Sequence, residues 1–94
     1  MQFPMWRGHR LVPSTSAQHE MMDLGLDLHD VENVLECGFD CHKGKRKLGT
    51  VERCTRVNGK VLRVVVAEDE VEYPDGELEP VWVIIHAGIS SQWR

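Results

Sequence analysis

The dipeptide Asn58-Gly59 constrains the fold of this chain more than any other feature, because it lies inside the alternating stretch LGTVERCTRVNGKVLRVVVAE. An Asn-Gly pair flanked by alternating β-branched residues is the strongest short-range signal for a β-hairpin with a type I′ turn. A two-residue turn also fixes the register, so that Val57 lies opposite Lys60 and Cys54 lies opposite Arg63. The sequence therefore predicts a β-hairpin over residues 48–68.

Alternation along this hairpin predicts two faces of different character. The face expected to form the core against the helices carries Val51, Thr55, Val57, Leu62, Val64 and Val66, with Arg53 and Lys60 as polar members. The opposite face carries Thr50, Glu52, Cys54, Arg56, Val61, Arg63 and Val65. The predicted hairpin therefore has a mainly apolar core face and a mainly polar outer face.

Two short helices are predicted ahead of the hairpin. In the first, Thr15 is expected to cap with Gln18 as its capping-box partner, and Gly25 supplies a left-handed stop. In the second, Asp27 is the expected cap and Gly38 ends the helix. Both helices carry an apolar stripe at helical spacing, formed by Ala17, Met21 and Leu24 in the first and by Leu28, Val31, Val34 and Leu35 in the second.

The remaining segments complete one α+β domain over residues 1–94. Residues 81–88 are apolar on both faces and predict a central third strand, after an acidic connection that turns at residues 74–76. Residues 1–13, with Pro4 and Pro13, are expected to be irregular, and residues 89–94 are expected to form a flexible tail. The expected architecture is two N-terminal helices packed on an antiparallel β-sheet of three to four strands.

Charge is segregated along the chain, although the net charge of the 94 residues is only −4. Residues 42–63 hold eight Lys and Arg against Glu52 alone, whereas residues 64–79 hold seven acidic residues and no cation. Such separation creates a local field of one sign in a protein that is acidic as a whole. The alternative is that the two blocks neutralise each other within the fold.

Several features favour a cytoplasmic protein without a membrane partner. No apolar run approaches the roughly 20 residues of a membrane span, and the N-terminal stretch MQFPMWRGHRLVP lacks the continuous apolar core of a secretory signal. Three cysteines without such a signal indicate a reducing cytosol, where thiols stay free or bind metal.

A polyanion such as RNA is the partner that the basic block suggests. The stretch HKGKRK carries Lys43, Lys45, Arg46 and Lys47, and Arg53 follows on the first strand of the hairpin. Cations in a loop can contact successive phosphates, which gives affinity without sequence choice. The alternative interpretation is a solvated charged loop that binds nothing.

Hydrolysis of RNA would require a general base, a general acid and cations that stabilise a pentavalent phosphate. Glu52 is the candidate base on the polar hairpin face, and Arg56 and Arg63 are the candidate charge stabilisers. His19 and His86 are candidate acids. In an apolar strand such as residues 81–88, however, a single histidine is also commonly a structural residue.

Zinc is the alternative use of the stretch CGFDCH, because Cys37, Cys41, His42 and the later Cys54 offer ligands of suitable softness. The spacing lacks a second C-x₂₋₄-C pair, and small cysteines more often pack as hydrophobes. We therefore expect no metal and no other cofactor. A redox pair of cysteines is a further alternative, and it requires two Cα atoms within about 7 Å of each other.

The stretch SAQHEMMDLGLDLHDVENVLECG resembles a prokaryotic family of small domains of unknown function, whose first helix reads H-A-x-x-R-M-x-x-R-G-I. The matching residues are Ala17, Met21, Gly25 and Leu26 in the first helix and Val31, Val34 and Leu35 in the second. The departures are Ser16 in place of His, and Glu20 and Leu24 in place of Arg. The resemblance covers residues 15–66.

That family is similar in architecture to RelE- and BrnT-like toxins, with two helices on a curved antiparallel sheet. The resemblance therefore implies a ribonuclease-like or toxin-derived ancestry. If the family's His and Arg are catalytic, this chain lacks them in its first helix and retains only His19 nearby.

Three functions follow as expectations. The first is a small toxin-like or RNA-interacting domain, in which any enzymatic activity would be that of a ribonuclease-like hydrolase or transferase. The second is a protein-interaction module without catalytic activity, in which the acidic segment Glu68–Glu79 and the basic loop bind a partner or a second copy of the chain. The third is a small zinc-binding protein.

Overall fold

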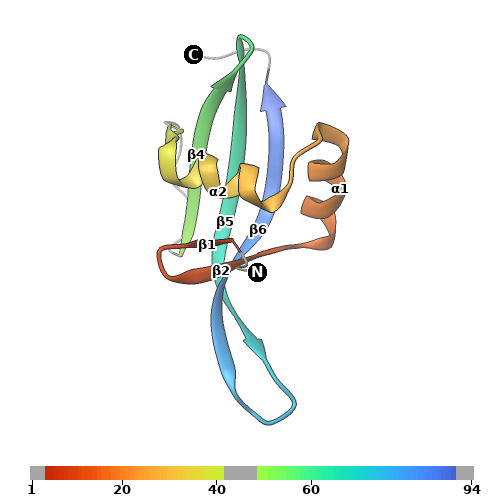
Figure 1. Cartoon of the computed structure of the whole chain (residues 1–94), viewed down its shortest axis with the longest axis vertical. Helices are drawn as coiled ribbons and strands as arrows, with labels where there is room; N and C mark the ends of the chain where they lie inside the picture. Colours follow the sequence, from red (N-terminus) through yellow and green to blue (C-terminus); the bar gives the residue numbers. More distant parts are fainter. Residues whose placement is uncertain (1–3, 42–48, 91–94) are drawn as a thin grey trace.

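The computed structural model describes residues 4–41 and 49–90, which form two helices and one curled sheet (Figure 1). In chain order the elements are β1 (Met5–Trp6), β2 (His9–Pro13), α1 (Thr15–Leu24), α2 (Leu28–Cys37), β3 (Phe39–Asp40), β4 (Thr50–Val57), β5 (Lys60–Glu72) and β6 (Leu78–Ser90). Within the described residues the sheet has six strands in the order β1-β2-β6-β5-β4-β3. The predicted α+β class is confirmed.

The predicted sheet of three to four antiparallel strands is wrong in strand number and in strand direction. β2 runs parallel to β6, with Arg10 opposite Val81 and Pro13 opposite Ile84, whereas the other neighbouring strands are antiparallel. β1 and β2 come from the segment that was expected to be irregular. Pro4 precedes β1 and Pro13 ends β2, so the two prolines lie at strand boundaries, where a missing N–H is tolerated.

The tight turn that joins β1 to β2 explains why the sequence did not predict these two strands. Arg7 and Gly8 both have positive φ angles, 50° and 79°, which nearly repeat the 51° and 79° of Asn58 and Gly59. Both pairs therefore form two-residue turns with the positive φ angles that a type I′ turn requires. Arginine is rare at such an angle, so the sequence gives no warning of the first turn.

The hairpin at Asn58-Gly59 has the predicted register, with Val57 opposite Lys60 and Cys54 opposite Arg63. β5 and β6 continue beyond it and pair as far as Glu72 and Leu78. The distal part of this pair, residues 70–80, projects from the body of the protein as a two-stranded arm (Figure 1). At its other end β6 includes residues 89 and 90, so the flexible tail predicted from residue 89 is wrong for these two; residues 91–94 lie outside the described part.

Both predicted helices are confirmed, with one change of cap. The hydroxyl of Ser14, and not that of Thr15, accepts the Ala17 N–H at 3.1 Å. Gly25 ends α1 with a φ of 70°, as its position predicts. Asp27 caps α2, and it forms a reciprocal capping box with Asp30.

The main core lies between the helices and one face of the sheet. α2 packs against β4 and β5, and α1 packs against β6 and β2 (Figure 1). The buried residues of this core cluster are Trp6, Leu11, Ala17, Met21, Val31, Val34, Leu35, Leu62, Val64, Val66, Trp82, Ile84 and Ala87. The opposite face also buries Cys54, Val61 and Val65, so it is less polar than the alternation predicts. We call this opposite face the outer face.

None of the helices in the described part is long and apolar enough to cross a membrane.

Candidate functional site

A row of four charged or titratable side chains crosses the sheet from β4 to α1. Arg63 Nε lies 3.2 Å from Glu52 Oε2, and Arg63 Nη2 lies 3.4 Å from His86 Nε2. His86 Nδ1 in turn lies 3.1 Å from Glu20 Oε2. We call Glu52, Arg63, His86 and Glu20 the charged row. It joins three strands and one helix that are distant in the sequence.

Strand pairing positions the first three members of the charged row. Glu52 and His86 both pair with Val65, one from each neighbouring strand, and Arg63 lies two residues before Val65 on β5. Because side chains alternate along a strand, all three therefore point to the outer face. Val65, between Glu52 and His86, is only 1% exposed.

A β-bulge gives His86 its direction. Val65 pairs with His86 but Val66 pairs with Ile84, so Ile85 is an extra residue in β6. Without this extra residue Ile84 and His86 would point to the same face; with it, Ile84 is fully buried in the core and His86 lies on the outer face. The imidazole also lies over Gly88, where an added Cβ would come within 3.1 Å of Nε2.

The contacts of His86 fit a neutral imidazole that donates from one nitrogen and accepts at the other. In this arrangement Nε2 accepts from Arg63, and Nδ1 is directed to the Glu20 carboxylate at 3.1 Å. Glu20 Oε1 also accepts the backbone N–H of Ala87 at 2.9 Å, which fixes the carboxylate at the edge of β6. A carboxylate that orients an imidazole is an arrangement suited to general acid–base chemistry, and the His86 side chain is 38% exposed.

Glu52 is the residue predicted as a general base. Its side chain is only 8% exposed and forms an ion pair with Arg63, whose side chain is 48% exposed. A carboxylate held in this way positions the guanidinium and is poorly placed to accept a proton from a substrate. Arg63 and His86 are thus the accessible members of the row on the sheet.

The two other predicted catalytic residues lie apart from the charged row. Arg56 is exposed on the outer face, opposite Val61, and its side chain forms no hydrogen bond or ion pair with another described residue. His19 is exposed on α1 and is likewise without such a contact in the described part of the chain. The structure therefore brings together Glu52, Arg63 and His86 of the predicted set.

Glu20 is the member of the charged row that the sequence did not identify as a site residue. Its only signal is that an acidic residue stands where the resembling family has arginine. Its partner His86 is 66 positions away in the sequence, and helix periodicity carries no information about a contact of that range.

The predicted nucleic-acid-binding residues are mostly outside the described part. Lys43, Lys45, Arg46 and Lys47 fall within residues 42–48. Arg53 lies in the described part, and its guanidinium bonds to two residues of the fold. Nη1 donates to Asp40 Oδ1 at 2.8 Å, and Nη2 donates to the Gly38 carbonyl at 2.7 Å. Arg53 therefore fastens the segment after α2 to β4.

Cys41 and Cys54 form a disulfide with a Cα–Cα distance of 5.5 Å. This corrects the expectation of free or metal-bound thiols, because two of the four candidate zinc ligands are consumed by the bond. The reason is the short strand β3, which pairs Phe39 with Cys54 and so carries Cys41 next to it. Cys37 is a free and exposed thiol, and His42 lies outside the described part. The described residues contain no cluster of three or more metal-ligating side chains.

The arm carries a second polar cluster. Arg10 Nε and Nη2 donate to Glu79 at 3.1 and 3.0 Å, and the Tyr73 hydroxyl donates to the same carboxylate at 2.6 Å. The bond from Arg10, followed by that from Tyr73, lowers the pKa of Glu79 from 4.5 to about 2. The same carboxylate raises the pKa of Tyr73. These contacts link β2 to the arm.

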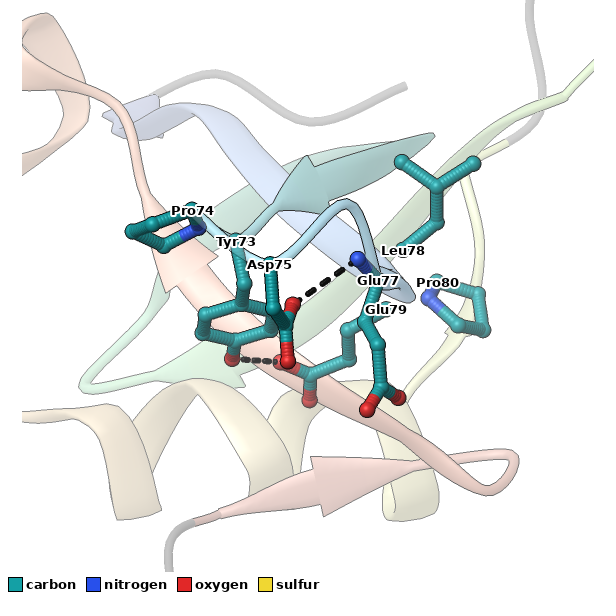
Figure 2. Close-up of a pocket in the computed structure, with 7 residues that line it drawn as sticks. All are labelled: Tyr73, Pro74, Asp75, Glu77, Leu78, Glu79 and Pro80. Carbon is teal, nitrogen blue, oxygen red and sulfur yellow. Dashed lines mark hydrogen bonds between the residues drawn. The ribbon is translucent and has the colours of Figure 1, made fainter.

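A shallow hollow at the end of the arm is lined by residues of the arm alone, as Figure 2 shows. Its turn is closed by the backbone N–H of Tyr73, which donates to the Glu77 carbonyl, and by the Asp75 carboxylate, which accepts the Glu77 N–H at 2.9 Å. The lining residues are Tyr73, Pro74, Asp75, Glu77, Leu78, Glu79 and Pro80. None of the residues that line this hollow belongs to the charged row.

Comparisons with protein-family models, with curated proteins and with solved structures find no match to this chain.

Proposed function

We propose that this protein is a toxin-like, RNA-interacting domain whose outer sheet face binds the phosphodiester backbone. The observation that carries the proposal is the contact series Glu20–His86–Arg63, which puts an oriented imidazole and a half-exposed guanidinium side by side. Arg56 adds a second cation on the same face. Cleavage of a phosphodiester requires cations that stabilise the negative charge of the phosphate and a group that transfers a proton.

If the domain acts as a ribonuclease, each member of the charged row has a distinct role. His86 Nε2 accepts the proton of the ribose 2′-hydroxyl while the 2′-oxygen attacks the phosphorus, and the carboxylate of Glu20 stabilises the resulting imidazolium. The bond from phosphorus to the 5′-oxygen breaks, which leaves a 2′,3′-cyclic phosphate, and water supplies the proton to the departing 5′-oxygen. Arg63 moves from Nε2 to the phosphate, where it and Arg56 neutralise the charge that develops on the non-bridging oxygens. Glu52 acts as a positioning residue for Arg63.

The binding part of the proposal is tested by fluorescence anisotropy with a single-stranded RNA oligonucleotide. We expect affinity at low salt, with the logarithm of the binding constant falling linearly with the logarithm of the salt concentration. Replacing both Arg56 and Arg63 with Gln is expected to reduce the affinity by about tenfold, because each lost phosphate contact removes part of the electrostatic term. Absence of binding by the wild-type protein at low salt rejects the proposal.

Replacing Lys43, Lys45, Arg46 and Lys47 with Ala tests the contribution of the basic segment in the same assay. We expect a further loss of affinity and a shallower salt dependence, because fewer counterions are released on binding.

The catalytic part is tested with a matched pair of histidine variants. His86→Ala is expected to abolish cleavage of an RNA oligonucleotide, whereas His19→Ala, an exposed histidine outside the charged row, leaves cleavage unchanged. A DNA oligonucleotide of the same sequence, which lacks the 2′-hydroxyl, is expected to stay intact. Equal cleavage by both histidine variants would assign the chemistry to other residues.

A second candidate function is supported by the arm. Residues 70–80 project from the body and carry five carboxylates, and Leu78 on the arm is 56% exposed (Figure 1). We propose this arm as a surface for a cationic protein partner or for a second copy of the chain. Size-exclusion chromatography at low and high salt tests self-association: a salt-insensitive monomer excludes it.

A further inference from the structure

The Cys41–Cys54 disulfide joins two sulfurs in different surroundings. Cys54 lies in β4 and is 1% exposed, whereas Cys41 follows β3 and is half-buried. An incoming thiol must approach the bond along the line of the two sulfur atoms, and it attacks the more accessible one. Attack at Cys41 makes Cys54 the leaving group.

Cys54, whose sulfur is the leaving group, lies on the same sheet face as a cation. Arg63 is the direct cross-strand partner of Cys54, and both side chains point to the outer face. A thiolate that forms at Cys54 therefore lies directly across the strand pair from Arg63, whose positive charge stabilises it electrostatically and speeds its departure. Glu52 also contacts this guanidinium, so it offsets part of that effect.

We infer that Cys41–Cys54 is a thiol-exchange site of this protein, with Cys41 as the attacked sulfur, Cys54 as the leaving thiolate and Arg63 as its positioning cation. The co-reactant is a small thiol of the glutathione type. Its thiolate attacks Cys41 Sγ, a new S–S bond forms there, and the Cys41–Cys54 bond breaks. The electron pair leaves on Cys54, which takes a proton from water; a second thiol then displaces Cys41 and completes the two-electron reduction.

The third cysteine offers an internal competitor that the experiment must exclude. Cys37 is free and exposed at the end of α2, next to Gly38. An added Cβ at Gly38 would collide with the Cys54 carbonyl, so this end of α2 lies against the backbone of Cys54. A Cys37→Ser variant therefore serves as the working background, in which only an external thiol can open the disulfide.

The experiment treats oxidised Cys37→Ser protein with glutathione under native conditions and quenches the reaction with iodoacetamide. Peptide mass spectrometry then locates the two adducts. We expect glutathione on Cys41 and the carbamidomethyl group on Cys54 at early times. The reverse placement of the adducts overturns the inference, and so does exchange that occurs only when denaturant unfolds the chain.

Two arginine variants of that background test the role of the cation. Arg63→Gln is expected to slow the exchange about threefold, since leaving-group stabilisation enters thiol exchange with partial weight. Arg56→Gln is the matched control: it removes a cation from the same face, but its cross-strand partner is Val61 and not Cys54. Equal rates for the two variants remove Arg63 from the proposal. All rates use protein whose native fold is verified by circular dichroism, and none of these readouts requires RNA.

Discussion

His86 Nδ1 lies 3.1 Å from Glu20 Oε2, and this contact joins β6 to α1 across 66 positions of sequence. The other oxygen of the same carboxylate accepts the Ala87 N–H. Glu20 therefore closes the edge of β6 beyond the end of β2 and also orients the imidazole.

Replacing Glu20 with Ala is expected to destabilise the protein by about 1 kcal/mol, because the Ala87 N–H loses its acceptor and the imidazole loses the carboxylate beside it. Glu20→Gln keeps an oxygen that can accept the Ala87 N–H, so its cost is expected to be smaller. Urea denaturation measures both. Glu36→Ala, an exposed carboxylate on α2, is the control and should change stability little. A cost for Glu20→Ala no larger than that of the control would contradict the prediction.

Replacing Gly88 with Ala is expected to disturb the charged row, because the new Cβ comes within 3.1 Å of His86 Nε2. The imidazole must then shift away from Arg63. In a His86→Ala background this crowding is absent, so Gly88→Ala should be about 0.5 kcal/mol more favourable there than in the wild-type protein. A double-mutant cycle based on urea unfolding gives this coupling, and a value near zero would show that the ring is not crowded.

The cluster of Arg10, Tyr73 and Glu79 is expected to make stability depend on acid pH. The pKa of Glu79 is lowered from 4.5 to about 2 in the folded protein. Its ionised form therefore stabilises the fold fully above about pH 4.5, and this contribution is lost as the pH falls towards 2. The difference in Tm between the wild-type protein and Glu79→Gln should be constant above pH 4.5 and shrink below it.

A Tyr73→Phe variant tests the cause of this pH dependence over the same pH range. This variant removes the hydrogen bond that is the second cause of the lowered pKa of Glu79, while the bond from Arg10 remains. The folded-state pKa of Glu79 is then closer to 4.5, so the loss of its contribution should be smaller and should be complete at a higher pH than in the wild-type protein. An identical pH profile in both proteins would mean that Tyr73 does not stabilise the ionised carboxylate.

Reduction of the disulfide is expected to destabilise the protein by about 3 kcal/mol, the order predicted by chain entropy for a loop of this length. The two cysteines are separated by 13 positions in the sequence. Urea denaturation of oxidised protein and of protein in excess dithiothreitol measures the difference. Cys37→Ser should show the same difference, since Cys37 is not part of the bond. A difference below about 0.5 kcal/mol would contradict this prediction.

The sequence predicted the central hairpin and the helices because their signals are local. Asn58 and Gly59 adopt the positive φ angles that their residue types favour, and the two-residue turn then dictates the register as far as Ala67. The stop at Gly25 and the capping box of Asp27 are equally local. The first edge hairpin escaped prediction because its turn, Arg7-Gly8, lacks the usual first residue.

The candidate site was predictable only in part. The alternation of β4 and β5 was enough to put Glu52 and Arg63 on one face. It could not reveal that Glu52 would be almost buried and paired with Arg63, because burial depends on what neighbouring strands add. It also could not reveal the disulfide, because β3 is only two residues long and has no period of its own.

The sequence by itself determined the α+β class, two capped helices and the register of one hairpin, since each depends on residues within a few positions of one another. The tertiary structure alone decided the parallel pairing of β2 with β6, the bulge at Ile85 that turns His86 to the outer face, and the contact of His86 with Glu20. The physical reason is the separation of these segments along the sequence, since they approach one another only when the whole core is packed.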